Sequence, residues 1–117
     1  MPDRHPYKRG EVVLVQFPFS GPGGKIDRPA VILSTDSYHD DWDELLLAAI
    51  TSRPPRTTRT TDCALQDWKT AGLHQPSWVR SHMATVHRTL IIIRKLGNLT
   101  ARELHAIEGC LRDSLGL

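Results

Sequence analysis

The sequence has no long apolar run. None of its segments approaches the roughly 18 consecutive apolar residues that a membrane-spanning helix requires. The first residues, Met1 to Pro6, also lack the apolar core of a secretory signal. We therefore expect a cytoplasmic protein that does not associate with a membrane.

Cysteine is scarce. The chain has two cysteines, Cys63 and Cys110, and they do not form a Cys-x-x-Cys pair. A chain of 117 residues buries roughly two thirds of its extended surface on folding, so it needs no disulfide framework. The two residues predict buried, reduced thiols rather than a disulfide, and no redox function.

Motifs for phosphate-loop, metal or histidine chemistry are missing as well. The glycine-rich residues 20–25 are not followed by Lys-Ser/Thr at the required spacing, which predicts a hairpin loop. The segment His39-Asp40-Asp41 with Asp43 lacks a second group of ligands, so we interpret it as a solvated acidic loop. Six histidines are present, but no motif links two of them as an acid–base pair. We expect His39 and His74 at the surface or on a helix face, no essential histidine, and no metal or cofactor.

The composition is that of a globular domain, and the charges are segregated along it. With 39% hydrophobic and 24% charged residues, we expect a single domain over residues 1–117. The net charge of +2 is too small to identify a nucleic-acid partner. However, an acidic stretch at residues 36–44 is followed by Arg53, Arg56 and Arg59 with no acid among them. Such an arginine run fits either a phosphate backbone or a solvated loop.

The hydrophobic pattern predicts short strands followed by one helix. β-Branched, aromatic or apolar runs predict strands at residues 11–19, 29–34, 44–51, 62–65, 77–80 and 83–93, the last strand ending at Gly97. One helical turn is expected at residues 67–72. Thr100 and Glu103 predict a capping box, and Leu104, Ile107, Leu111 and Leu115 form one apolar helix face. The fold class is therefore mainly β: a strongly curved sheet or partial barrel of five to seven strands with a terminal helix.

Several blocks of the sequence resemble one family. Residues 10–20, 28–34 and 47–52 read GEVVLVQFPFS, RPAVILS and LAAITS, and in this order they resemble the MazF/PemK toxins. The resemblance continues through residues 71–73, 76–80 and 96–99. It implies an SH3-like β-barrel of the MazF/CcdB type, a homodimer, and a metal-independent endoribonuclease of a type II toxin–antitoxin system. It also implies that single-stranded RNA is the substrate and that a small antitoxin silences the protein.

The same resemblance implies that Arg28 and Thr51 are the catalytic residues. A guanidinium is suited to two phosphate oxygens and stays charged, so Arg28 fits a transition-state clamp and is a poor general base. The Thr51 hydroxyl can donate to a phosphoryl oxygen, with Ser52 as a second hydroxyl. The base stays unassigned. Two features depart from the family pattern, and both concern substrate choice. The loop before Arg28 is short for the family, and Asp27 lies directly beside Arg28.

Further residues are candidates for contacts with RNA. Basic side chains that suit phosphates are Lys25, Arg53, Arg56, Arg80 and Arg88. Phe17 and Phe19 could stack on a base, although ordinary core packing explains them better because both lie in an apolar strand. Ser20 and the loop that follows it are expected to take part in base readout.

Two other functions are compatible with the sequence. A gyrase-poisoning toxin of the CcdB type shares the barrel, but that family relies on a tryptophan at the C-terminal end. Here the last tryptophan is Trp78, and the sequence closes with DSLGL. The second alternative is a barrel that binds RNA or protein without cutting, because a fold can persist after activity is lost.

Overall fold

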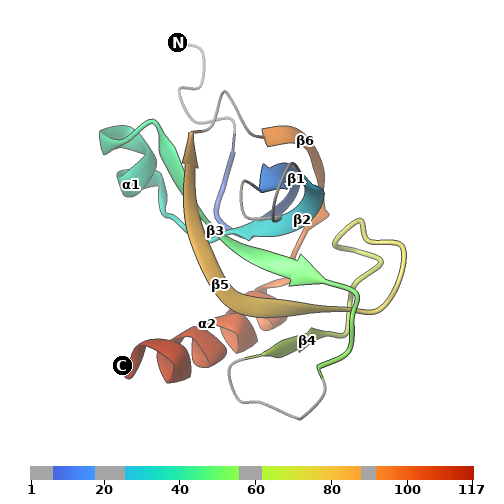
Figure 1. Ribbon diagram of the computed structural model, residues 1–117. Coiled ribbons are helices and arrows are strands. Elements are labelled where there is room, and N and C mark those ends of the chain that lie inside the picture. Colours follow the sequence, from blue (N-terminus) through green and yellow to red (C-terminus); the bar gives the residue numbers. More distant parts are fainter. Residues whose placement is uncertain (1–6, 18–25, 56–61, 88–91) are drawn as a thin grey trace.

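The structure, a computed structural model, describes residues 7–17, 26–55, 62–87 and 92–117. Within these ranges the elements in chain order are β1 (Glu11–Phe17), β2 (Ile26–Ile32), α1 (Asp36–Asp41), β3 (Glu44–Thr51), β4 (Cys63–Leu65), β5 (Ser77–His87), β6 (Ile92–Asn98) and α2 (Ala101–Leu115). The strands form one antiparallel sheet in the order β4-β5-β3-β2-β1-β6. Figure 1 shows that this sheet curls into a half-barrel, with α2 packed against β4 and β5. The predicted mainly-β fold with a terminal helix is confirmed.

Breaks in strand register help the sheet to curve. The pairing of β1 with β6 shifts between Val12 and Val13 and again between Leu14 and Val15. The pairing of β3 with β5 shifts between Ala48 and Ile50. Such bulges bend a strand and increase its local twist, which allows a six-stranded sheet to wrap around its contents.

Both faces of the sheet are buried, which explains why the strands read as nearly continuous apolar runs. Successive side chains of a strand point to opposite faces. On β1, fully buried Val12 joins the cluster that contains Ile107 of α2, whereas Val13 joins a second cluster with Ala30 and Leu47. Burial on both faces therefore leaves little polar alternation in the sequence.

Helix α2 begins where its sequence predicts, but the capping box is only half formed. The Thr100 hydroxyl oxygen accepts a hydrogen bond from the Glu103 backbone N–H at 3.2 Å. The buried Glu103 carboxylate does not return to Thr100; it accepts from the Asp67 backbone N–H at 2.6 Å. Glu103 thus fastens the helix to the turn after β4. Leu115, predicted on the apolar face, is 55% exposed near the helix end.

The predicted helical turn at residues 67–72 is a hydrogen-bonded turn outside regular helix. The Gly72 N–H donates to the Lys69 carbonyl and the Leu73 N–H to the Trp68 carbonyl, each at 3.0 Å. These two bonds have the pattern of a Schellman motif, and Gly72 has the positive φ of 81° that this motif requires. The glycine was therefore read correctly as the end of the turn.

The acidic segment was predicted wrongly as a loop. It contains helix α1, whose first turn is capped by Thr35 through a 3.3 Å bond from the Tyr38 N–H. His39, expected at the surface or on a helix face, lies on α1 but is only 4% exposed. Its Nε2 lies 2.6 Å from the Ser34 hydroxyl, and the Ser34 oxygen accepts a hydrogen bond from the Leu46 backbone N–H. This contact ties α1 to the start of β3.

Several strand boundaries also differ from prediction: β1 ends at Phe17 rather than residue 19, and β2 runs from Ile26 to Ile32 rather than over residues 29–34. The strands expected at residues 77–80 and 83–93 are in fact one long strand, β5, that ends at His87. The apolar residues that follow belong in part to β6, which runs from Ile92 to Asn98. The run of isoleucines gave no signal of where one strand stops and the next begins.

The cysteines are free thiols, as predicted. Cys63 is buried on β4 and Cys110 is half-buried on α2. Burial, together with a hydrogen bond between the two side chains, raises the pKa of the Cys63 thiol to about 12. Cys63 is therefore a neutral core residue at physiological pH.

Candidate functional site

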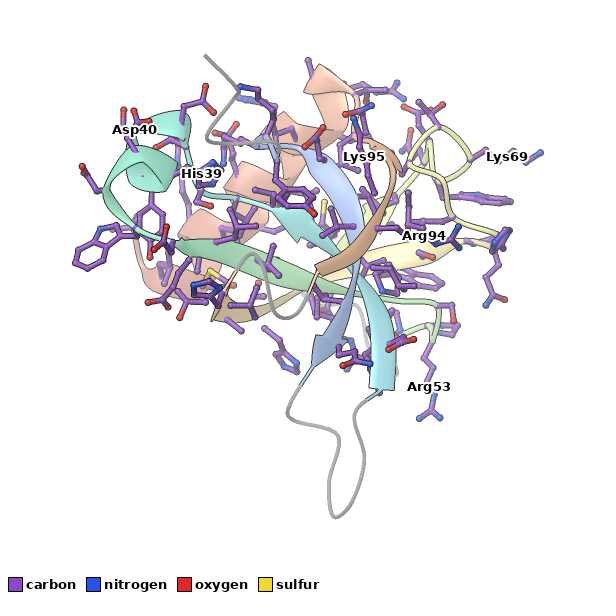
Figure 2. All side chains as sticks on the ribbon, turned by 90° about the horizontal axis from the view of Figure 1, so that it is seen from above. His39, Asp40, Arg53, Lys69, Arg94 and Lys95 are labelled. Carbon is purple, nitrogen blue, oxygen red and sulfur yellow. The ribbon has the colours of Figure 1, made fainter. Side chains whose placement is uncertain are left out.

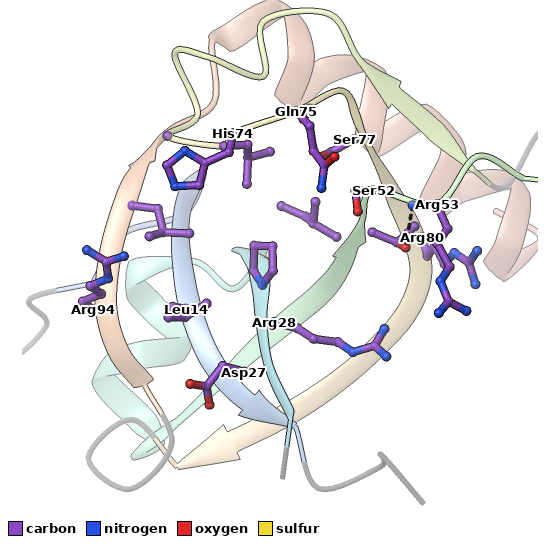
Figure 3. A pocket seen from close by; sticks show the side chains of 16 residues that line it. Leu14, Asp27, Arg28, Ser52, Arg53, His74, Gln75, Ser77, Arg80 and Arg94 are labelled. Carbon is purple, nitrogen blue, oxygen red and sulfur yellow. Dashed lines mark hydrogen bonds between the residues drawn. The ribbon is translucent and has the colours of Figure 1, made fainter. Parts of the chain in front are cut away.

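A pocket of about 590 Å³ opens where β2 begins and β3 ends (Figure 3). Volumes of a few hundred to roughly 1,000 Å³ are typical of small-molecule sites. Its apolar lining comes from Leu14, Pro29, Ile50, Leu73 and Leu96, three of which also pack against the core. Polar and charged side chains supply the rest of the lining, so the pocket joins an apolar surface to a charged rim.

The two predicted catalytic residues meet in this pocket. Arg28 is exposed on β2, and Thr51 is the half-buried last residue of β3. The register that pairs Ala30 with Ala49 reaches Arg28 and Thr51 two residues further along. Residues at matching positions of antiparallel strands have side chains on the same face. Strand pairing therefore brings together two residues that are far apart in the sequence.

The Thr51 hydroxyl has a defined orientation. Its oxygen accepts a hydrogen bond from the Arg53 backbone N–H at 3.2 Å. A hydroxyl has one proton and two lone pairs, so accepting this bond leaves the proton available to donate to a ligand. The turn after β3 thus presents Thr51 as a hydrogen-bond donor.

Three of the proposed RNA-binding residues line the same pocket. They are Ser52, Arg53 and Arg80, and Figure 3 shows the two arginines on the same side as Arg28. The remaining candidates fall outside the described side chains: Phe17, Phe19, Ser20, Lys25, Arg56 and Arg88. Of these, only Phe17 has a described backbone, as the last residue of β1.

The pocket has a marked excess of positive charge. Of the described residues that line it, four are arginines (Arg28, Arg53, Arg80 and Arg94) and one is a carboxylate (Asp27). Within the described ranges none of these arginines forms an ion pair, whereas outside the pocket Arg9 pairs with Glu108 and Lys95 with Glu11. Figure 2 shows that Arg53 and Arg94 lie on the opposite side of the molecule from Asp40 of α1. The charge segregation seen in the sequence is thus also a segregation in space.

Sequence reasoning missed Arg94, His74, Gln75 and Ser77, which also line the pocket. His74 is exposed, as predicted, but it borders the pocket rather than a featureless surface. For Arg94 a signal existed, because Leu96 is two residues away and packs against the core, so alternation places both on one face of β6. That signal could be used only with the correct boundary of β6.

Two close backbone contacts fix this side of the pocket. A Cβ atom on Gly72 would lie 2.1 Å from the Leu96 carbonyl oxygen. A Cβ atom on Gly97 would lie 2.6 Å from the Ala71 carbonyl carbon. The turn that leads to His74 therefore crosses directly against β6, and glycine is needed on both partners.

Comparison with known families decides the affiliation. The sequence model of the PemK-like, MazF-like toxins of type II toxin–antitoxin systems matches residues 8–115. The chain belongs to this family. No curated protein matches this MazF-like toxin by direct sequence comparison.

Solved structures share the fold of the MazF-like toxin at low sequence identity. MazF of Deinococcus radiodurans is 23% identical with a TM-score of 0.72, over 95% of this chain and 97% of that one. The toxin MazF-mt6 of Mycobacterium tuberculosis is 20% identical with a TM-score of 0.73, over 92% and 97%. An endoribonuclease from a mycobacterial species, solved with its cognate antitoxin, is 19% identical with a TM-score of 0.73, over 95% and 96%.

The described residues of the MazF-like toxin contain neither a group of metal-binding side chains nor a membrane-spanning helix. In the part of the chain that the structure covers, no three His, Cys, Asp or Glu side chains are grouped as they would be to share a metal ion. Among the described helices, none has the length and apolar character that crossing a membrane requires.

Proposed function

We propose that this MazF-like toxin is an endoribonuclease that cuts single-stranded RNA. The observation that carries the proposal is the meeting of Arg28 and Thr51, the arginine and threonine of the family's motifs, in one positively charged pocket. The mycobacterial endoribonuclease has the same fold, which is consistent with this activity. The excess of arginine side chains suits a polyanion, and the apolar lining suits the faces of unpaired bases.

The proposed reaction is an internal transesterification. The 2′-oxygen of the substrate attacks the adjacent phosphorus, and the bond from phosphorus to the 5′-oxygen breaks. A 2′,3′-cyclic phosphate and a free 5′-hydroxyl result, after one proton leaves the 2′-oxygen and one reaches the 5′-oxygen. Because the substrate supplies the nucleophile, the reaction needs no activated water and no metal ion to generate one.

Each catalytic residue has a distinct role in this scheme. The Arg28 guanidinium stabilises the negative charge that grows on the equatorial phosphoryl oxygens. Thr51 donates its hydroxyl proton as a hydrogen bond to the same group, oriented by the Arg53 N–H. Arg28 is a poor base because it holds its proton so strongly. The group that removes the 2′-proton stays unassigned.

Single-stranded RNA is the proposed substrate because the reacting groups must align. The 2′-oxygen has to lie in line with the departing 5′-oxygen, and unpaired nucleotides can turn into that arrangement. Proteins that read single strands stack bases on side chains and follow the backbone with basic groups. Ser52, Arg53 and Arg80 are proposed to hold the backbone on the Arg28 side of the pocket.

The family affiliation supports two partners for the cytoplasmic toxin. One is a second copy of the chain, since the two ends of the sheet leave β4 and β6 as edge strands. The other is an acidic antitoxin segment, which would occupy the positive pocket and exclude RNA. The D. radiodurans neighbour solved as MazE–MazF has the same fold as this chain, at 21% identity.

The test is a cleavage assay with the purified protein on end-labelled single-stranded RNA. Discrete fragments support the endoribonuclease. Binding without fragments would indicate a non-catalytic barrel, and trapped gyrase–DNA complexes without RNA cleavage would indicate a CcdB-like toxin. Sequencing the 5′ ends of cellular RNA after induced expression identifies the cut motif.

A further inference from the structure

We propose that Arg94 and His74 form a second phosphate subsite, on the side of the pocket away from Arg28. In this arrangement one RNA phosphate lies at Arg28 and Thr51 and another phosphate of the same strand lies at Arg94 and His74. The nucleotides between them rest on the apolar lining. The inference rests on the proposed function because the ligand is RNA, and it adds a site that the two catalytic residues do not require.

Strand register separates the two subsites. Leu14 pairs with Pro29 of β2 on one side and with Arg94 of β6 on the other. All three residues line the pocket, so this cross-strand row runs along its surface. Neighbouring strands are roughly 4.8 Å apart, which puts β6 about 10 Å along the sheet from β2. Arg28 is next to Pro29 on β2, and Figure 3 shows its side chain on the opposite side of the pocket from Arg94.

The contact between Gly72 and Leu96 brings His74 to the Arg94 side. Gly72 packs on the Leu96 backbone, His74 follows two residues later, and Arg94 precedes Leu96 by two residues. Figure 3 shows His74 and Arg94 on the β6 side of the pocket, and Arg28, Arg53 and Arg80 on the other. The pocket thus has two cationic ends separated by apolar side chains.

The charge on the β6 side is available to an anion. Arg94 is exposed, and within the described ranges no carboxylate pairs with it. Its neighbour Lys95 is different, because Lys95 forms a 2.6 Å ion pair with Glu11. Among the described residues that line the pocket, the one carboxylate, Asp27, belongs to β2 rather than to this side. Arg94 can hold two phosphate oxygens, and the His74 ring can donate one N–H.

The salt dependence of binding measures the number of phosphates that are held. The probe is a fluorescent ten-nucleotide oligouridylate with 2′-O-methyl groups, which has no free hydroxyl to attack and is not cut. Each phosphate neutralised on a single strand contributes about −0.7 to the slope of log K against log salt. For Arg94→Gln we expect a slope less steep by about 0.7. When the salt concentration rises fourfold, the affinity of the wild type should therefore fall by a factor about 2.6 times larger than the affinity of Arg94→Gln.

Two variants serve as controls. Arg112→Gln removes the same charge from an exposed position of α2 that does not line the pocket, so its slope should equal the wild-type slope. Arg94→Lys keeps the charge and should keep most of the slope. An unchanged slope in Arg94→Gln, or an equal change in Arg112→Gln, overturns the subsite.

A second experiment locates the phosphate. Uncharged methylphosphonates replace one phosphate at a time in a 2′-O-methyl RNA centred on the mapped cut site. The wild type should lose affinity at two separate positions, and Arg94→Gln should lose sensitivity at only one of them. Sensitivity retained at both positions would contradict the assignment. Binding with the expected slope but no cleavage of ordinary RNA would reject the endoribonuclease activity and support the subsite. Cleavage of ordinary RNA with no effect of Arg94→Gln on binding would support the endoribonuclease activity and reject the subsite.

Discussion

Arg28 and Thr51 both line the pocket, and each lies two residues beyond the Ala30–Ala49 pair that ends the pairing of β2 with β3. Their positions are set by the pairing of β2 with β3, whose side chains are buried on both faces of the sheet, and not by a contact between the two side chains. Removing either side chain should therefore change the chemistry of the site and leave the fold intact.

Arg28→Ala and Thr51→Ala should each lower the rate of RNA cleavage by about 10²- to 10³-fold, the usual cost of removing one transition-state donor. Thermal unfolding should change little, because polar substitutions away from the core typically alter stability by about 0.5 kcal/mol or less. Single-turnover cleavage and melting curves measure the two effects. Arg112→Ala is the matched control and should cut RNA at the wild-type rate. Full activity in both pocket variants would reject the assignment.

The toxin should be a homodimer. Light scattering is expected to give twice the chain mass of 13.2 kDa. Association would cover an exposed sheet edge, which small β-proteins otherwise have to protect. A monomer at micromolar concentration that still cuts RNA would remove the dimer from the mechanism.

Cys63 should make stability fall at alkaline pH. The pKa of its thiol is about 12 in the folded chain, against an ordinary value near 8.5 in the unfolded chain. Between these values the folded state keeps a proton that the unfolded state has lost. The stabilisation is therefore complete below about pH 8.5 and declines as the pH rises toward 12. Urea titrations from pH 7 to pH 10 measure it, and Cys63→Ala should show a shallower decline than the wild type.

Gly72→Ala should be strongly destabilising. The new methyl group would lie 2.1 Å from the Leu96 carbonyl oxygen, and the backbone has a φ of 81°. The left-handed conformation alone costs roughly 1–2 kcal/mol, and the clash adds to it. Gly109→Ala, in the middle of α2 with nothing within 4 Å, should instead raise the free energy of unfolding by about 0.5–1 kcal/mol. Equal effects of the two substitutions in urea would refute this account of the turn.

Elements with local signals were predicted well. β3 has the predicted bounds because Pro54 and Pro55 stop any longer element, and α2 starts after its Thr100 cap. Helix α1 was missed because this short acidic segment has no apolar periodicity. No local sequence pattern indicates that the His39 ring contacts the Ser34 hydroxyl.

The residues of the site were only partly predicted from the sequence, for similar reasons. Motifs identified Arg28 and Thr51, and the structure brings them together. Arg94 was missed because its place in the pocket depends on the pairing of β6 with β1, which contains two register shifts. His74 was missed because its position follows from the backbone crossing of Gly72 over Leu96. Contacts between distant segments leave no pattern that one stretch of sequence can show.

The most direct test of the proposed chemistry uses a short RNA that contains one mapped cut site, incubated with the toxin in excess EDTA. The all-ribose RNA should yield a 2′,3′-cyclic phosphate, or its opened 3′-phosphate, and a 5′-hydroxyl. The same RNA with a single 2′-deoxy sugar immediately upstream of the scissile phosphate should bind and remain uncut. Cleavage of the deoxy-substituted RNA, or a 5′-phosphate product, would contradict attack by the 2′-oxygen under Arg28 and Thr51.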